Sequence, residues 1–138
     1  MAAEQLYETL PKEVRQSIGD VPELVHRLQS DAQLMRQRYD EIQVALAGAG
    51  DSAAATDSAD LRAMRDAVHV KLTDAVTALE TIRLNLLRLH AGSATVDGLT
   101  THLGMAAEVS ADVQRLIAAQ EEVARSLKIA RLAPIAST

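Results

Sequence analysis

ALETIRLNLLRLHAG, residues 78–92, decides which fold this chain adopts. Within it, IRLNLLRL alternates apolar and polar residues, as does a β-strand with one buried face. The same letters also fit the last turns of a long amphipathic helix, because apolar residues three or four positions apart share one helical face. The choice depends on how far each pattern extends along the chain.

The helical pattern extends much further than the alternation. Its members follow one another at steps of three or four residues: Leu61, Met64, Val68, Leu72, Ala75, Leu79, Ile82, Leu86 and Leu89. A stutter of one extra four-residue step falls near Val68. The alternating stretch contains only one β-branched residue, Ile82. The spacing therefore predicts a helix over 58–91.

Two other segments carry the same spacing. The first contains Val21, Val25, Leu28, Ala32, Met35, Tyr39, Ile42 and Leu46, and the second contains Leu99, His102, Ala106, Val109, Val113, Leu116, Gln120, Val123 and Leu127. Steps of three and four that alternate over several heptads are typical of a coiled-coil seam. They predict helices over 20–47 and 98–131.

Residues typical of helix ends support these bounds. Asp20 and Glu23 have the spacing of a capping box, with Pro22 in the first turn. The other expected end residues are Gly19 and Gly92 at carboxyl ends, and Asp57 or Ser58 and Thr95 or Asp97 at amino ends. A short helix over 3–18, a flexible loop over 48–57 and a frayed tail over 132–138 complete the prediction.

The predicted fold is a single all-α domain over 1–138. It is an elongated, antiparallel, three-helix, coiled-coil-like bundle, and the short helix lies over one end. Two alternatives stay open. The chains could assemble into a larger bundle, and helix 20–47 could pack in cis or swap between copies.

Composition narrows the function classes. The chain has no Cys, Phe or Trp, so neither a disulfide framework nor a thiolate metal site is available. Its net charge of −5 argues against nucleic acid as the main partner. The start lacks the apolar stretch of a secretory signal, and no apolar run is long enough for a bilayer. We expect a cytoplasmic location and a protein partner, with no membrane or small-molecule substrate.

We expect no enzymatic activity, cofactor or metal, because a narrow aliphatic seam offers no pocket for converging ionisable groups. The four histidines, His26, His69, His90 and His102, show no HExxH pattern and no pair four residues apart. His102 and Gln120 fall on the seam, where a polar residue fixes the register between helices.

Some apolar residues lie beside the seams. Leu84 and Leu87 flank the seam of helix 58–91, and Leu103 and Ile117 flank that of helix 98–131. A widened apolar face lets one helix contact two neighbours. These four residues are the candidates for contact with a partner, or with another copy of the chain, wherever the folded monomer leaves them exposed.

RLHAGSATVDG, residues 88–98, resembles the histidine motif of phosphotransfer bundles in part. In that family a lysine and a glycine follow the histidine by three and four residues. Ser93 and Ala94 occupy those positions after His90. A phosphotransfer-like signalling bundle is therefore one alternative function, and a purely structural coiled-coil segment of a larger assembly is another.

LPKEVRQSIGDVPELVHRLQSDAQLMRQR (10–38) and ALETIRLNLLRLHAG together resemble a helical region that follows the catalytic domain in some bacterial serine/threonine protein kinases. The resemblance covers about residues 10–127. It implies a regulatory or interaction tail whose own activity is to bind. No glycine loop, His-Arg-Asp or Asp-Phe-Gly motif is present, so no kinase catalytic residue carries over.

Overall fold

The computed structural model describes residues 3–49 and 55–136, and these form five helices without a strand. The helices are α1 (Ala3–Glu8), α2 (Lys12–Ile18), α3 (Val21–Ala49), α4 (Ala55–His90) and α5 (Val96–Ala136). The stretch IRLNLLRL lies within α4. The helical interpretation of that stretch is confirmed.

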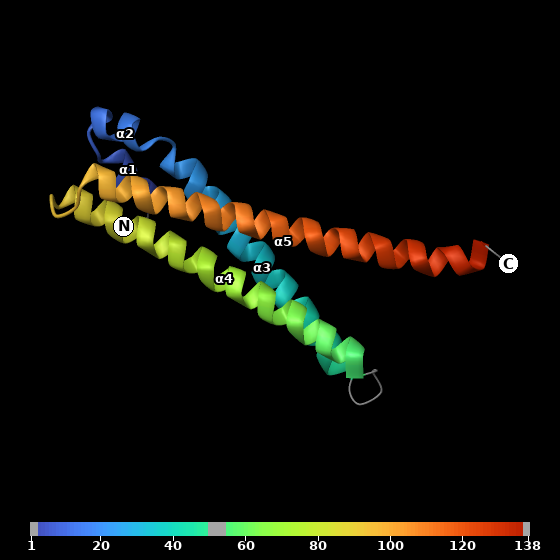
Figure 1. The fold of residues 1–138 in the computed structure, drawn as a ribbon. Coiled ribbons are helices and arrows are strands. Elements are labelled where there is room, and N and C mark those ends of the chain that lie inside the picture. The colour runs from blue at the N-terminus through green and yellow to red at the C-terminus, as the bar shows by residue number, and fades with distance from the viewer. Residues whose placement is uncertain (1–2, 50–54, 137–138) are drawn as a thin grey trace.

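Each of the three long helices runs antiparallel to the one before it, so α3 and α5 point the same way along the bundle (Figure 1). α3 and α4 form an antiparallel hairpin, and α5 packs against both helices from Leu99 to about its middle. α5 then diverges from the hairpin and extends beyond it. α1 and α2 cover the end of the molecule where α4 turns into α5. The predicted all-α bundle is confirmed.

The predicted bounds of the helices need three corrections. The predicted helix over 3–18 is two helices, because Pro11 lacks the N–H that a continuous helix would use. The loop predicted over 48–57 is shorter, since α3 reaches Ala49 and α4 already begins at Ala55; residues 50–54 lie outside the described part. Asp57 and Ser58, predicted to precede α4, therefore lie inside it.

The third correction concerns the carboxyl-terminal end. The prediction ends the last helix at residue 131 and gives a frayed tail over 132–138, but α5 continues to Ala136. This segment is rich in Ala, Leu and Arg, which are strong helix formers. Pro134 lies close to the helix end, so it breaks little of the hydrogen-bond ladder. Residues 137–138 lie outside the described part.

The predicted capping residues act at four helix ends, one of them being Gly19, with a φ of 80°, after α2. The Glu23 N–H donates a hydrogen bond to Asp20 Oδ1 over 3.1 Å at the start of α3. Gly92 has a φ of 79°, which suits the residue after the end of a helix. At the start of α5 the Gly98 N–H donates to Thr95 Oγ1 over 3.1 Å, so Thr95 is the cap.

The seam residues form two apolar clusters along the bundle. The first, at the end covered by α1 and α2, contains Leu6, Leu10, Ile18, Val21, Val25, Leu28, Ala78, Ile82, Leu86, Leu99, Leu103 and Ala106. The second, between the hairpin and the middle of α5, contains Met35, Ile42, Val68, Val113 and Ile117. The buried members of both clusters are Met and aliphatic residues, as expected for closely packed helices.

Candidate interaction surfaces

A row of exposed aliphatic side chains lies on the side of α4 that faces away from the core. Val76 is 48% exposed, Leu84 is 37% exposed and Leu87 is 42% exposed. On the opposite side of the same helix, Ile82 and Leu86 are completely buried. We call Val76, Leu84 and Leu87 the outer α4 face. Leu84 and Leu87 are the two predicted partner contacts that remain exposed in the folded chain.

One ion pair lies between the aliphatic residues of this face. Arg83 Nη2 donates to Glu80 Oε1 over 2.6 Å, and Arg83 Nε donates to Glu80 Oε2 over 3.2 Å. These hydrogen bonds lower the pKa of the Glu80 carboxyl and raise the pKa of Arg83. Glu80 is exposed, so the pair adds little to stability.

Leu103 and Ile117 are buried within the chain. Leu103 is 7% exposed and Ile117 is 8% exposed, and each belongs to one of the two apolar clusters. α5 contacts α2, α3 and α4, so its flanks are covered from several sides. Both are core residues of the single chain. They were candidates for partner contact only if the monomer left them exposed, and it does not.

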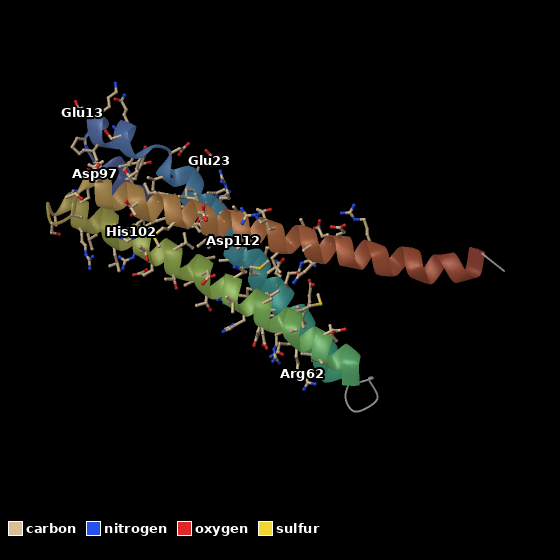
Figure 2. The ribbon with its side chains drawn as sticks, in the orientation of Figure 1. Glu13, Glu23, Arg62, Asp97, His102 and Asp112 are labelled. Carbon is tan, nitrogen blue, oxygen red and sulfur yellow. The ribbon has the colours of Figure 1, made fainter. Side chains whose placement is uncertain are left out.

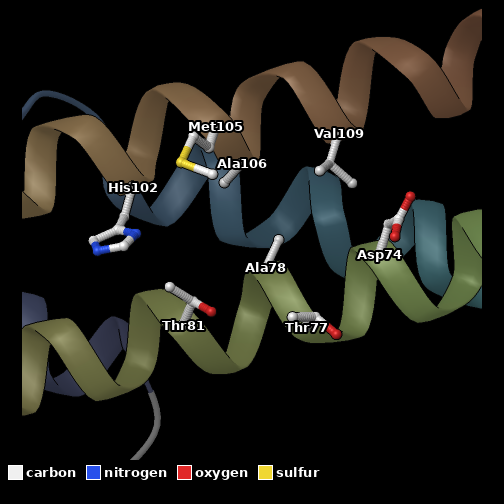
Figure 3. A pocket seen from close by; sticks show the side chains of 8 residues that line it. All are labelled: Asp74, Thr77, Ala78, Thr81, His102, Met105, Ala106 and Val109. Atoms are coloured by element: carbon white, nitrogen blue, oxygen red, sulfur yellow. The ribbon is translucent and has the colours of Figure 1, made fainter.

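His102 lies in an open slot between α4 and α5 (Figure 3). The slot has a volume of about 300 Å³, and α3 passes behind it. Its lining residues are Asp74, Thr77, Ala78, Thr81, His102, Met105, Ala106 and Val109. His102 is half-buried and Met105 is 61% exposed. The predicted seam histidine is thus at the wall of an accessible apolar slot.

Gln120 lines a second groove, at the point where α5 leaves the hairpin. This groove has a volume of about 440 Å³ and is lined by Asp60, Ala63, Met64, Ala67, Leu116, Ala119 and Gln120. We call it the wedge. Gln120 is only 9% exposed, and its buried Nε2 has no hydrogen-bond partner within the described part of the chain. A buried donor without an acceptor is costly.

A buried polar cluster that the sequence did not predict lies between α3 and α5. Asp31 is 2% exposed, and its carboxylate accepts hydrogen bonds from Ser110 Oγ over 2.7 Å and Gln114 Nε2 over 2.8 Å. Asp31 and Ser110 each lie next to a seam residue in the sequence. Their positions beside apolar seam residues indicated that both side chains could be buried. Only the structure shows that Asp31 and Ser110 contact each other.

Ion pairs also join the long helices. Asp112, in the middle of α5 (Figure 2), lies 3.8 Å from Lys71 Nζ of α4. Arg38 of α3 lies 3.9 Å from Glu121, where α5 begins to separate from the hairpin. Both pairs are partly exposed, so they add to the register between helices more than to stability.

The other histidines lie on the surface of the bundle. His26, His69 and His90 are exposed, and the ring centroid of His69 lies 5.6 Å from that of Tyr39. His90 is the last residue of α4, followed by the turn at Gly92. A phosphotransfer histidine lies in the middle of a helix, so the position of His90 does not favour that alternative.

No protein-family model matches the chain, and neither a curated protein nor a solved structure matches it. Within the helices that the structure describes, none combines the length and the hydropathy needed to cross a bilayer.

Proposed function

We propose that this chain is a non-enzymatic helical interaction module whose outer α4 face binds an amphipathic helix of another protein. The observation that carries the proposal is the exposure of Val76, Leu84 and Leu87 on one side of a helix whose opposite side is fully buried. Exposed aliphatic residues that gather on one helical face are typical of a surface that packs against a partner.

The neighbouring slot extends this face. Leu84 follows Thr77 by seven residues and Thr81 by three, so all three lie along the same side of α4. Thr77 and Thr81 line the slot, and the exposed Met105 of α5 lies across it. A partner helix lying over α4 and α5 would contact Leu84 and Met105 together. Val76 to Leu87 spans about 16 Å, or three turns of such a helix.

The chemistry of the slot supports binding over catalysis. Its ionisable residues, Asp74 and His102, lie at opposite ends of it (Figure 3). Asp74 Oδ2 lies 3.8 Å from Lys71 Nζ, so Asp74 forms an ion pair with Lys71. Between these ends the walls are made of small or aliphatic residues and two threonines. Acid–base catalysis needs groups that converge on one reacting atom.

We place this activity in the cytoplasm, in bacterial signalling. The resemblance of residues 10–127 to the helical region of some serine/threonine kinases supports a role as a regulatory tail. In that role the module would bring a kinase and a helical partner together, and it would need no cofactor of its own.

Site-specific photo-crosslinking tests the proposal. A benzophenone side chain replaces Leu87 in cells that produce the protein, and the matched control replaces Arg36, which is exposed on α3. We expect an adduct from position 87 that position 36 does not give and that Leu84→Glu removes. The crosslinked helical segment, made as a peptide, should bind the purified protein about tenfold more weakly after Leu84→Glu. Equal adducts from both positions, or unchanged peptide binding, would contradict the proposal.

A further inference from the structure

Four residues of α4 form a stripe along its exposed side. Val76, Glu80, Arg83 and Leu87 follow one another at steps of four, three and four residues, so their side chains share one side of the helix. Val76 is 48% exposed and Leu87 is 42% exposed. The side chains of Glu80 and Arg83 are 55% and 36% exposed. We call these four residues the α4 stripe, and Leu84 of the outer α4 face lies beside it.

The order of residues along the α4 stripe is self-complementary. The stripe reads aliphatic, acidic, basic and aliphatic from its amino-terminal end. The outer pair, Val76 and Leu87, and the inner pair, Glu80 and Arg83, are centred on the same point of the helix. A second α4 that lies antiparallel across this point places Val76 of each copy opposite Leu87 of the other. It also places Glu80 of each copy opposite Arg83 of the other, so opposite charges meet.

A parallel pair of α4 helices would lose this match. Glu80 would then lie opposite Glu80, and Arg83 opposite Arg83, so like charges would meet. The antiparallel arrangement also suits the next positions at the same spacing. Thr73 and His90 are both exposed, and each lies opposite the other across the same centre. The charges of α4 therefore favour an antiparallel second copy as the occupant of this face.

The ion pair within each chain is compatible with these contacts. Arg83 Nη2 donates to Glu80 Oε1 over 2.6 Å, and this bond holds both charged groups on the α4 stripe. An arginine carries more N–H donors than one carboxylate uses. Arg83 can therefore keep its own Glu80 and also donate to Glu80 of a second copy. Four alternating charges would then lie at the centre of the contact.

We infer that two copies of this chain pair through their α4 stripes in an antiparallel dimer with twofold symmetry. A twofold axis through the centre of the stripe makes every contact reciprocal. The inference rests on the proposed function because it uses the same face, and it adds a form of regulation. The dimer covers the outer α4 face and must open before the helix of another protein binds there. The stripe spans about 16 Å, a small contact, so the dimer forms at high protein concentration.

Charge reversal in the full-length protein tests this pairing. Light scattering of the wild type at rising concentration should give a mass that approaches twice the 14.8 kDa of the chain. Glu80→Arg alone and Arg83→Glu alone should each dimerise about tenfold more weakly or worse, since like charges then meet across the axis. The double variant with both changes should dimerise as the wild type does, because the two charges only exchange places.

Matched controls reverse charges elsewhere. Glu41→Arg and Arg36→Glu, on the exposed surface of α3, have the same net charges as the two single variants and should leave the dimer intact. Circular dichroism checks that every variant is folded. A wild type that is monomeric at millimolar concentration, a dimer that survives both single reversals, or a double variant that stays monomeric would overturn the inference.

Cysteine pairing tests the direction and register of the two helices. The chain has no Cys, so a single introduced Cys forms a disulfide only with another copy. A mixture of Val76→Cys and Leu87→Cys should form an intermolecular disulfide about tenfold faster than either variant alone, because the antiparallel contact brings the two positions together. A variant that pairs with itself as fast as the mixture does would overturn the antiparallel arrangement.

The mass of the photo-crosslinked product separates this inference from the proposed function. Benzophenone at position 87 should give an adduct of two copies, at twice 14.8 kDa, and a separate adduct with the other protein. If only the adduct of two copies forms, the dimer is supported and the proposed function is wrong. If only the adduct with another protein forms and the wild type is monomeric, the dimer is wrong and the proposed function is supported.

Discussion

Ser110 Oγ donates a hydrogen bond to Asp31 Oδ2 over 2.7 Å, joining α5 to α3 in the interior of the bundle. Ser110 is completely buried and Asp31 is 2% exposed. The buried carboxylate of Asp31 is stabilised by its hydrogen-bond donors. Losing one of them is costly, because water does not reach the site to replace it. The pair therefore favours one register between two parallel helices over its neighbours.

Ser110→Ala should lower the free energy of unfolding by about 1–3 kcal/mol, since Asp31 Oδ2 loses its donor while it stays buried. Replacing both partners, with Asp31→Leu and Ser110→Ala, should recover much of that loss because no charge is then buried. Urea unfolding measures both variants. Ser17→Ala, on the exposed side of α2, is the control and should change stability by less than about 0.5 kcal/mol. A double variant less stable than Ser110→Ala would contradict this explanation.

The two faces of α4 should respond differently to truncation. Ile82→Ala removes a fully buried side chain and should cost about 2–5 kcal/mol, because a cavity remains in the core. Leu84→Ala, two residues later and 37% exposed, should cost much less. Thermal unfolding of the two variants compares them directly. Equal losses would mean that Leu84 is buried in solution, as in an assembly that covers it.

Two glycines should respond to alanine with opposite signs. Gly92 has a φ of 79°, so Gly92→Ala forces a left-handed alanine and should destabilise the protein by about 1–2 kcal/mol. Gly104 lies within α5, and a Cβ there would meet no atom within 4 Å. Gly104→Ala should therefore stabilise the helix by about 0.5–1 kcal/mol. Urea midpoints that move in the same direction for both variants would refute this reading of the two positions.

Glu80 should titrate below the ordinary range of a glutamate. The hydrogen bonds from Arg83 favour its ionised form, so its pKa is lower in the folded state than in the unfolded state. The contribution of the pair to stability is therefore present above the unfolded pKa and is lost as the pH falls through the folded pKa. Arg83→Met should return the pKa to the ordinary range. Carbon-detected NMR of the Glu80 carboxyl follows the titration, and identical curves for the two proteins would exclude the pair in solution.

The sequence was enough to predict the long helices because their signal accumulates over many residues. The spacing from Leu61 to Leu89 outweighs a short alternating stretch, and strong caps such as Asp20 and Gly92 mark ends that the structure confirms. The positions of the remaining helix ends depend on small differences in the helix propensity of a few residues. The predicted start of α4 was wrong because Ala55 and Thr56 already belong to the helix. The predicted tail after residue 131 was wrong for a similar reason.

The candidate surfaces were predictable only in part. Leu84 and Leu103 both flank a seam in the sequence, but the structure exposes the first and buries the second. The difference depends on where a third helix lies, and periodicity within one helix does not contain that information. The same reason explains why the contact between Asp31 and Ser110 could not be predicted, since the two residues are far apart in the chain and belong to different helices.

The first apolar cluster also determines when the fold can be completed during synthesis. Leu6 and Leu10 belong to the same cluster as Leu86 and Leu99. A ribosome needs roughly 5–18 s to add the intervening residues at ordinary translation speeds. Leu6 and Leu10 of the nascent chain therefore stay accessible to chaperones until the start of α5, with Leu99, has been made.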